Sequence, residues 1–545
     1  MSTAQDADAT RVEAWTPHPP EVVRRYRRLG LWMGVSLWDR LAQQVERTPN
    51  ALAVVDRRQR LTYRELSERA LSLARGLYAL GIGPRDTVLV QLENGAPLIE
   101  LYFALFRLGA RPVATQPAHR RHELQQLARQ ASACAHFHGA KHGRFDLTEL
   151  SAELLDTCPS LRHSVLIDDR SQTWQQLYRS SNLPLPVPPL STEIALLQLS
   201  GGSTAVPKLI PRTHDDYEYS VRRSAQLCAF GPSTIYLSTL PLTHNFPLSS
   251  PGVLGTLFAG GRVVCAEHPQ PQVTFPLIAA EQVSVTALVP GLLPLWFSAA
   301  ARHRSQLTSL KRVQVGGAPL TPAMAARVRS ELGCGLQQVF GMAEGLVCYT
   351  GLDEADERVA QYQGRPMSVF DEVRIVDDLD RDVPQGQQGH LLTRGPYTIR
   401  GYYRAPEHNA QAFTRDGFYR TGDRVVQLPD GGLRVVGRAK DQINRGGEKI
   451  AAPEVEALLC RHPLVDEAAL VAVPDPFLGE KSVAFLVCRG EVGAADLRLL
   501  LRQLGVAEFK VPDQVETLVD LPRTPVGKVD KNALREQAKG AGAKL

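Results

Sequence analysis

A stretch of glycine and small hydroxylated residues follows a short apolar run and ends in a lysine. The apolar run is Ile194–Leu199, and the segment after it reads Ser200-Gly201-Gly202-Ser203-Thr204-Ala205-Val206-Pro207-Lys208. Glycines let backbone N–H groups approach an anion, hydroxyls donate to its oxygens or bind a metal, and lysine adds positive charge. The segment therefore predicts a phosphate-binding loop. It is not a Walker A loop, because Pro207 precedes the lysine and neither Ser nor Thr follows it, which disfavours a P-loop kinase.

Three later segments also place charged residues beside glycine. Residues 337–345 read Gln-Gln-Val-Phe-Gly-Met-Ala-Glu-Gly, so that Phe340 precedes a glycine and Glu344 follows it. Tyr419-Arg420-Thr421-Gly422-Asp423 is expected to present an exposed carboxylate after a turn, and Leu521–Lys531 carries a lysine next to Gly527. Taken alone, the aromatic residue could belong to the core and the aspartate could cap its turn.

Together these segments resemble the adenylate-forming family, which includes acyl-CoA synthetases, luciferases and the adenylation domains of peptide synthetases. The motifs follow the family's order and extend from Leu61 to Lys531. One departure is Ala205, where the family's loop has a glycine. The resemblance implies an ATP- and Mg²⁺-dependent enzyme that forms an acyl-adenylate. It also implies that Lys528 is catalytic, because it would bridge the acid's carboxylate and the α-phosphate while charge builds there.

The resemblance assigns the nucleotide and metal contacts by position. It implies that Phe340 lies against adenine and that Asp423 accepts from the ribose hydroxyls, with Arg438 beside it. Magnesium takes hard oxygen ligands, and Glu344 and Thr204 are the residues that would hold it. The full set expected to bind ATP is Ser200, Gly201, Gly202, Ser203, Thr204, Lys208, Gly316, Gln338, Val339, Phe340, Gly341, Asp423, Arg438 and Lys528.

The segment Thr243–Gly252 indicates which acid is activated. Most relatives that activate amino acids have an aspartate near this point to hold the ammonium group, whereas the polar groups here are neutral. A buried ammonium without a partner is costly, while Asn245 and Ser250 can hydrogen-bond phenolic hydroxyls. A flat aryl acid is therefore expected. The expected substrate contacts are Asn245, Phe246, Ser250, Gly317, Ala343 and Val347, and His244 is either a catalytic gate at this pocket or a buried polar residue.

Three runs, Pro211–Tyr217, His244–Gly252 and Gly341–Val347, look like the stand-alone aryl-acid activators of siderophore assembly, specifically 2,3-dihydroxybenzoate–AMP ligases. Salicylate activators are similar but tend to have cysteine in place of Ser250 and leucine in place of Val347. The resemblance thus favours 2,3-dihydroxybenzoate, with transfer to the phosphopantetheine of a separate aryl carrier protein. Phe246 and Cys348 depart from the tyrosine and asparagine expected, so salicylate or another 3-hydroxy aryl acid stays open, as does transfer to free CoA.

A second step is implied for the C-terminal part of the chain. In relatives this part turns about a residue that matches Lys440, which delivers first Lys528 and then a loop that reads Asn444-Arg445-Gly446-Gly447-Glu448-Lys449 here. Gly446 and Gly447 would let a pantetheine arm pass close to the backbone during thioester formation. An inactive nucleotide-binding scaffold is the alternative from another class. Retention of Lys208, Glu344, Asp423 and Lys528 argues against it.

Alternating strand and helix patterns must position these residues. A helix is expected over 61–80 and another over 98–108, with strands at 87–92, 194–199, 234–240, 262–266, 283–289 and 312–315. This alternation predicts parallel sheets covered by helices. From about Val369 short β-rich pieces take over, namely 372–376, 389–394, 425–428 and 433–436, and a helix at 453–460 and a strand at 468–473 follow.

The predicted fold is therefore α/β and multidomain. We expect a large N-terminal adenylation core at 1–439, with a β-rich subdomain at about 369–436, and a compact, mobile α+β domain at 440–545. A chain of 545 residues exceeds what one core supports. The net charge is +5, and the sequence has no basic run with interleaved aromatic residues, so nucleic acid is not an indicated partner. No apolar run is long enough to span a membrane, and scattered cysteines favour a cytoplasmic protein without disulfides or structural zinc.

Overall fold

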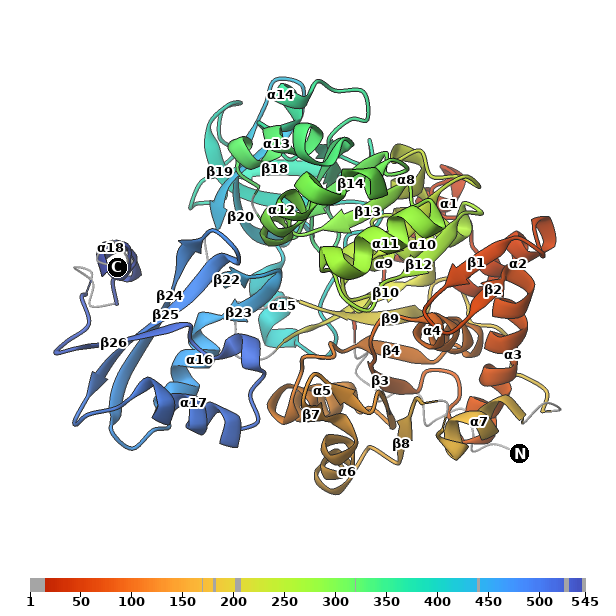
Figure 1. The fold of residues 1–545 in the computed structure, drawn as a ribbon, viewed down its shortest axis with the longest axis horizontal. Coiled ribbons are helices and arrows are strands. Elements are labelled where there is room, and N and C mark those ends of the chain that lie inside the picture. Colours follow the sequence, from red (N-terminus) through yellow and green to blue (C-terminus); the bar gives the residue numbers. More distant parts are fainter. Residues whose placement is uncertain are drawn as a thin grey trace.

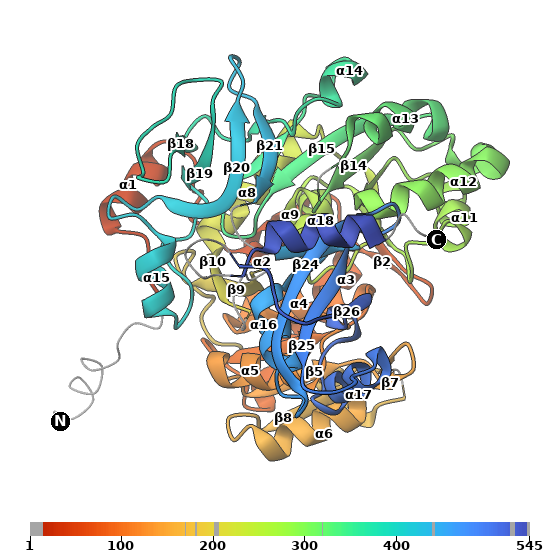
Figure 2. The same ribbon diagram turned by 90° about the vertical axis from the view of Figure 1, so that its left-hand side faces the viewer.

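A computed structural model describes residues 15–168, 170–179, 183–200, 207–318, 320–438, 442–523 and 529–541. Figure 1 shows a large region, coloured red to light blue, with a smaller blue region beside it at the left of the view. Two large sheets run through the middle of the large region, and helices cover their outer faces (Figures 1 and 2). The fold thus has the α/β multidomain architecture expected.

The first large sheet has nine strands in the order β17-β16-β15-β14-β13-β11-β12-β1-β2. Its central pairings, from β15 to β1, are parallel, and its edge pairings are antiparallel. In sheet order the bounds are Arg365–Pro366, Val347–Tyr349, Gly335–Gly341, Arg312–Gly316, Val285–Leu288, Ile235–Ser238, Arg262–Cys265, Leu52–Val55 and Arg60–Thr62. The carboxyl ends of the parallel strands β11, β13, β14 and β15 meet at one edge, where crevices form in sheets of this kind.

The second sheet has six strands in the order β10-β9-β4-β3-β5-β8. All its pairings are parallel except that of β10 with β9, which is antiparallel. The bounds are Leu209–Thr213, Ile194–Leu199, Arg111–Ala114, Thr87–Gln91, Ala135–His138 and His163–Leu166, and a separate hairpin pairs β6 (Lys141–His142) with β7 (Phe145–Asp146). Strand β3 is buried along its whole length, as expected of a parallel sheet covered on both faces.

Helices fill the connections, and α3 (Tyr63–Ala79) illustrates why they form. Thr62 and Glu65 make a reciprocal capping box at its start, in which each side chain accepts from the other's backbone N–H. Leu66, Leu73 and Leu77 recur at helical spacing and are fully buried. The other helices of the large region are α1 (Pro20–Arg28), α2 (Leu37–Arg47), α4 (Ala96–Leu108), α5 (Arg121–Ala131), α6 (Leu147–Thr157), α7 (Gln172–Arg179), α8 (His214–Leu227), α9 (Asn245–Ser249), α10 (Gly252–Phe258), α11 (Pro271–Glu281), α12 (Leu293–His303), α13 (Pro322–Leu332), α14 (Asp356–Val359) and α15 (Pro406–Ala412), with 3-10 turns at Pro290–Leu292 and Arg304–Leu307.

A four-stranded antiparallel sheet follows, in the order β18 (Glu372–Val376), β19 (Gln388–Arg394), β20 (Tyr419–Gln427) and β21 (Leu433–Arg438). One sequence expectation is wrong here. Asp423 is not exposed after a turn, because β20 begins at Tyr419 and includes it, and its exposed fraction is only 2%. The strand was expected to begin at residue 425, and a register shift beside Asp423 interrupts the regular pattern that would have revealed the longer strand.

The C-terminal domain is a five-stranded sheet with helices on both faces. Its strands are β22 (Gln442–Arg445), β23 (Glu448–Ala451), β24 (Val465–Asp475), β25 (Gly479–Cys488) and β26 (Gln514–Leu518), and its helices are α16 (Ala452–Leu459), α17 (Ala494–Gln503), the 3-10 turn Glu508–Lys510 and α18 (Lys531–Ala541). Helix α18 packs on the face turned away from the large region (Figures 1 and 2). The expected boundary residue, Lys440, lies outside the described residues. Among the described helices, none combines the length and apolar content needed to cross a membrane.

Candidate active site

One cavity of about 190 Å³ lies where the large region meets the C-terminal domain. Its walls come from β9, α9, β15 and the turn after β15, and from the β22–β23 hairpin. It brings together most of the expected site residues from motifs that are far apart in the sequence. Those that line it are Ser200, His244, Asn245, Phe246, Ser250, Gly317, Val339, Gly341, Ala343, Glu344, Val347, Gly446 and Gly447.

The aryl side of the cavity, defined as Asn245, Phe246, Ser250, Val339 and Val347, is a mainly apolar pocket with two polar side chains. Its members touch one another: Phe246 packs against the cluster that contains the two valines, and the Ser250 N–H donates to Phe246 O at 3.1 Å. None of the lining residues on this side, all of which the structure describes, is acidic. The pocket therefore suits an uncharged ring that carries hydroxyl groups rather than an ammonium.

Asn245 is held in one orientation. The hydroxyls of Tyr217 and Ser249 both donate to Asn245 Oδ1, each at 3.0 Å. Because both donors go to the oxygen, the amide nitrogen is the atom that can serve a ligand. Gln198 supports this arrangement by donating to Tyr217 Oη at 3.4 Å. The asparagine is thus fixed as a hydrogen-bond donor before any substrate arrives.

The segment before α8 forms a buried support for the same pocket. Arg212 pairs with Asp216 at 2.7 Å, with both side chains almost fully buried. The guanidinium also donates to Ala343 O at 2.8 Å and lies 4.8 Å from the ring centre of Tyr217. Burial raises the pKa of Asp216 even though Arg212 opposes that shift. Arg212 therefore joins the wall at Ala343 to the tyrosine that orients Asn245.

The expected phosphate and magnesium residues meet around Tyr402. Tyr402 Oη donates to Glu344 Oε1 at 2.8 Å, and Lys208 Nζ lies 5.8 Å from the centre of the Tyr402 ring. Lys208 and Glu344 are both buried, and Ser200 joins them because its hydroxyl accepts from the Lys208 N–H at 3.0 Å. Burial, followed by the nearby Glu344 carboxylate, raises the pKa of Tyr402 well above its usual value. Sequence reasoning missed this tyrosine, which carries no motif of its own.

Strand β15 separates the aryl side from the four-stranded sheet. Because side chains alternate along a strand, Val339 and Gly341 line the cavity while Phe340 packs against a different apolar cluster, which includes residues of β20 and β21. The Gln338 side chain is engaged within the protein, where it donates to Val359 O at 2.5 Å. Gly316 is needed as glycine, since a Cβ there would lie 2.4 Å from Val339 O. Phe340, Gln338, Gly316 and Lys208 therefore adjoin the cavity without lining it.

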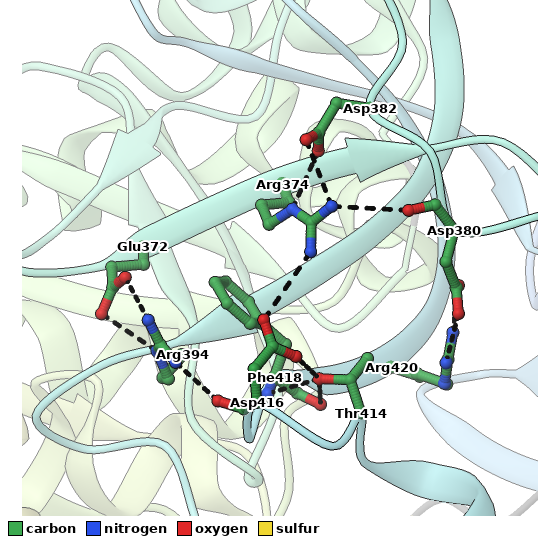
Figure 3. A network of polar contacts seen from close by, with 9 residues as sticks. All are labelled: Glu372, Arg374, Asp380, Asp382, Arg394, Thr414, Asp416, Phe418 and Arg420. Carbon is green, nitrogen blue, oxygen red and sulfur yellow. Dashed lines mark hydrogen bonds and ion pairs between the residues drawn. The ribbon is translucent and has the colours of Figure 1, made fainter.

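Asp423, expected at the ribose, also lies beyond the cavity wall. It pairs in register with Arg438 across β20 and β21. Figure 3 shows a network of charged residues that holds this sheet, in which Phe418 is surrounded by arginine–carboxylate pairs. Arg420 forms a bidentate pair with Asp380 next to the Thr-Gly-Asp segment. The members are Glu372, Arg374, Asp380, Asp382, Arg394, Thr414, Asp416, Phe418 and Arg420 (Figure 3). These pairs fix the strand that carries Asp423.

The hairpin side of the cavity, defined as Gly446, Gly447 and Glu448, comes from the C-terminal domain. Both glycines have positive φ, of 60° and 95°, which the tight turn between β22 and β23 requires. A Cβ on Gly447 would lie 3.0 Å from Val289 of the large region. The hairpin therefore approaches the cavity wall as closely as glycine allows.

Glu448 connects this hairpin to His244. The Gln116 amide donates to both Glu448 carboxylate oxygens, at 2.7 and 2.8 Å, and accepts from His244 Nε2 at 2.8 Å. Burial raises the pKa of Glu448, but the nearby His244, 3.8 Å away, and the hydrogen bonds from Gln116 reverse the shift and leave the pKa below its usual value. Burial lowers the pKa of the neighbouring His119 to about 4. Gln116 and His119 follow β4 and were missed, because single polar residues in that segment form no pattern.

Several expected site residues lie outside the described residues. They are Gly201, Gly202, Ser203 and Thr204 of the phosphate loop, Lys440 and Lys528. Of Arg438 only the backbone is described. Among the described residues, the cavity groups those expected to bind the acid and the magnesium ion with those of the hairpin.

The chain matches the AMP-binding enzyme family over residues 41–403 and the AMP-binding enzyme C-terminal domain over 454–528. The 2,3-dihydroxybenzoate-AMP ligase of Bacillus subtilis (strain 168) is 49% identical over 527 residues, which are 96% of this chain and 98% of that protein. A salicylyl-CoA synthase / salicylate adenylyltransferase of a Streptomyces species is 46% identical over 542 residues, 97% of this chain and 98% of that one. The apo structure of Mycobacterium smegmatis MbtA aligns with a TM-score of 0.75 and 43% identity, over 96% of this chain and 99% of that one.

Proposed function

The chain belongs to the AMP-binding enzyme family, and from this premise we propose that it is an ATP-dependent 2,3-dihydroxybenzoate–AMP ligase of siderophore biosynthesis. It would join the acid to AMP, release pyrophosphate and pass the aryl group to the phosphopantetheine thiol of an aryl carrier protein. One observation carries this proposal. A single cavity joins a hydroxyl-binding aryl pocket to Glu344 and to the glycine hairpin of the C-terminal domain. An acid, a nucleotide and a thiol arm could therefore meet there.

The aryl side supports 2,3-dihydroxybenzoate as the acid. Asn245 offers an oriented N–H to one phenolic oxygen, and Ser250, which is buried at 4% exposure, offers a hydroxyl to a second. A pocket that hydrogen-bonds a substrate hydroxyl discriminates strongly against an analogue that lacks it, because its polar groups are then left unpaired. The side chains of Val347 and Phe246 are apolar and suit the aromatic ring of the acid. Salicylate remains the second candidate, since Phe246 brings no hydroxyl of its own to the pocket.

Glu344 fits the magnesium ion that the family uses. Its Oε1 accepts from Tyr402, and Oε2 accepts no hydrogen bond from the residues that the structure describes, which leaves a hard anionic oxygen for a cation. Thr204 is the second proposed ligand. When bound, the ion would neutralise phosphate charge. Lys208 and Ser200 would hold the phosphates beside it, with Phe340 at the adenine and Asp423 and Arg438 at the ribose.

In the first half-reaction the chain's residues position two anions against each other. Asn245 and Ser250 orient the ring, so that its carboxylate points toward Glu344 and the phosphate loop. The carboxylate oxygen attacks the α-phosphorus in line, and the bond to pyrophosphate breaks. Lys528 is proposed to bridge the carboxylate and the α-phosphate, where preorganised positive charge stabilises the developing negative charge. A turn of the C-terminal domain about Lys440 would deliver Lys528 for this step, whereas in this structure the β22–β23 hairpin adjoins the cavity.

In the second half-reaction the hairpin side takes over. The pantetheine thiol attacks the aryl carbonyl, and AMP leaves with the electrons of the broken C–O bond. Gly446 and Gly447 line the cavity without side chains, so the arm could pass close to their backbone. His244 lies at the junction of the two sides, held by Gln116 and Glu448. The position of the β22–β23 hairpin at the cavity supports its assignment to this step.

The proposal is tested by following both half-reactions with purified protein. ATP, Mg²⁺ and each of 2,3-dihydroxybenzoate, salicylate and 3-hydroxybenzoate are supplied, and the aryl-adenylate and pyrophosphate are quantified. A phosphopantetheinylated aryl carrier protein or free CoA is then added, and the thioester is detected by mass. We expect adenylate from 2,3-dihydroxybenzoate and thioester on the carrier. Formation of adenylate from salicylate alone would make salicylate the substrate in place of 2,3-dihydroxybenzoate. Formation of thioester on CoA alone would make CoA the acceptor in place of the carrier protein. If no acid gave an adenylate, the result would support the inactive scaffold.

A further inference from the structure

A buried lysine joins the two domains beside the cavity. Lys510, in the 3-10 turn Glu508–Lys510, is 3% exposed. Its Nζ lies 2.9 Å from Glu123 Oε1, on α5 of the large region, and 2.7 Å from Glu454 Oε1, on α16 of its own domain. Burial lowers the pKa of Lys510, but the two carboxylates outweigh this and raise it. The lysine therefore stays charged within a buried carboxylate–ammonium–carboxylate bridge.

Backbone contacts surround this bridge on both sides. The Ala507 N–H donates to Glu123 Oε1 at 3.3 Å, across a separation of 384 residues. The His122 N–H donates to Gly505 O at 3.0 Å, and Arg121 donates to Gln503 O at 2.7 Å. The start of α5 thus contacts several residues of the segment 503–510. The Lys510 bridge lies at the centre of a fitted contact between the domains.

The bridge acts on the hairpin through a short stretch of chain. Glu454 lies in the first turn of α16, which begins immediately after β23, and β23 begins at Glu448. Glu448, Glu454 and Lys510 all line the cavity. A tether at Glu454 therefore fixes the base of the hairpin whose tip is Gly446-Gly447. Glu123 uses its other carboxylate oxygen to accept from the Arg120 N–H at 2.9 Å, so its own position is set by the start of α5.

We infer that Lys510 is a positioning residue for thioester formation, which holds the C-terminal domain in the orientation that places Gly446 and Gly447 at the cavity. The inference rests on the proposed function. Lys510 and Glu123 belong to different domains, so their contact must break whenever the C-terminal domain turns to deliver Lys528. In this orientation each charge of the bridge compensates the other, and removing one partner would leave a buried charge uncompensated, which is strongly destabilising. The bridge thus favours the second half-reaction and is absent from the first.

The test compares the two half-reactions in variants of the full chain. Glu123→Gln keeps the shape of the side chain, retains an oxygen for the α5 cap and leaves the Lys510–Glu454 pair intact. Lys510→Met removes the charge from the other side. In each variant we expect aryl transfer from preformed adenylate to the carrier to slow by about tenfold or more relative to pyrophosphate exchange. The loss is expected in kcat rather than in KM for the carrier. The double variant is expected to lose no more than Lys510→Met alone, because the two residues share one interaction.

Arg502→Ala is the matched control, because Arg502 pairs with Glu508 at 3.0 Å within the C-terminal domain and is 59% exposed. Its ratio of transfer to exchange is expected to stay within about twofold of the parent. Equal losses in both half-reactions, an unchanged ratio in Glu123→Gln, or additive losses in the double variant would each overturn the inference. If Lys510→Met does not fold, Glu123→Gln alone decides.

A measurement of domain orientation separates this inference from the proposed function. Spin labels are placed on Cys460, which is exposed, and on a cysteine introduced by Glu149→Cys, in a Cys488→Ser background. The other cysteines are buried. The parent is expected to show a distance population that matches this structure, and Glu123→Gln is expected to reduce that population by about twofold or more. An unchanged distribution would contradict the inference whatever acid the enzyme uses, whereas absent exchange in the parent would contradict only the proposed function.

Discussion

On the aryl side of the cavity, Asn245 is held by Tyr217 and Ser249, which belong to the same region of the chain. On the hairpin side, Glu448 is held by Gln116 and His244, which belong to the other domain. The first arrangement survives any movement of the C-terminal domain, whereas the second exists only in this orientation. Under the proposed function, acid selection would depend on a pocket fixed within one domain, while the choice of half-reaction would depend on contacts between domains that form and break.

The largest expected effect tests the rigidity of the aryl side. Arg212→Met leaves Asp216 buried without its partner, which is expected to lower the free energy of unfolding by about 3–5 kcal/mol. Urea denaturation followed by tryptophan fluorescence measures the change. Arg57→Met is the control, because Arg57 is 70% exposed and its pair with Glu267 should contribute no more than about 1 kcal/mol. Similar losses in the two variants would mean that the Arg212 pair does not stabilise the pocket.

The next effect separates the two half-reactions. Lys528→Ala is expected to reduce pyrophosphate exchange by about 10²–10³-fold, as removal of one group that stabilises developing charge does. Transfer from a supplied aryl-adenylate to the carrier is expected to persist, because that step uses the hairpin side. The control is Lys539→Ala, since Lys539 is 51% exposed on α18 and pairs only locally with Glu536 among described residues. Equal losses of exchange and transfer in Lys528→Ala would break the division between the two sides.

A smaller effect concerns the oriented amide. Asn245→Leu removes the donor and leaves the Tyr217 hydroxyl without its acceptor, which is expected to raise KM for 2,3-dihydroxybenzoate by about 10- to 100-fold. Benzoate, which has no hydroxyl, serves as the control substrate and should be affected much less. If KM for benzoate rose equally, the amide would act on the shape of the pocket rather than on a phenolic oxygen.

Much of the fold could be predicted because it is encoded locally. The helix at 63–79 has apolar residues at helical spacing, and strands such as Glu372–Val376 appear at the residues expected from alternating patterns and turn signals. Asp423 is the instructive failure. Its Thr-Gly-Asp sequence has the composition of a turn, but pairing with β21 extends β20 through it and buries the carboxylate. Pairing with the neighbouring strand decided its structure, and the composition of the Thr-Gly-Asp segment does not indicate that pairing.

The residues of the candidate site also differ in whether a local sequence pattern could predict them. Asn245, Ser250 and Glu344 could be found from their motifs, because each lies in a short run of distinctive residues. Gln116 and Lys510 could not, since each acts through partners on another domain. Lys510 lies in none of the motifs that the sequence offers, yet it is 3% exposed. Interdomain contacts arise from tertiary packing, so they are visible only once both domains are placed.

The most direct test of the acid assignment is the ratio of kcat/KM for 2,3-dihydroxybenzoate to that for salicylate, measured by pyrophosphate exchange in the parent and in Ser250→Cys. One hydrogen bond to the 3-hydroxyl predicts a ratio of about ten or more in the parent. Ser250→Cys should bring the ratio toward or below unity, because the larger thiol fills the space of that hydroxyl and donates only weakly. A parent that prefers salicylate, or a ratio that Ser250→Cys leaves unchanged, would contradict the proposal that Ser250 selects the catechol acid.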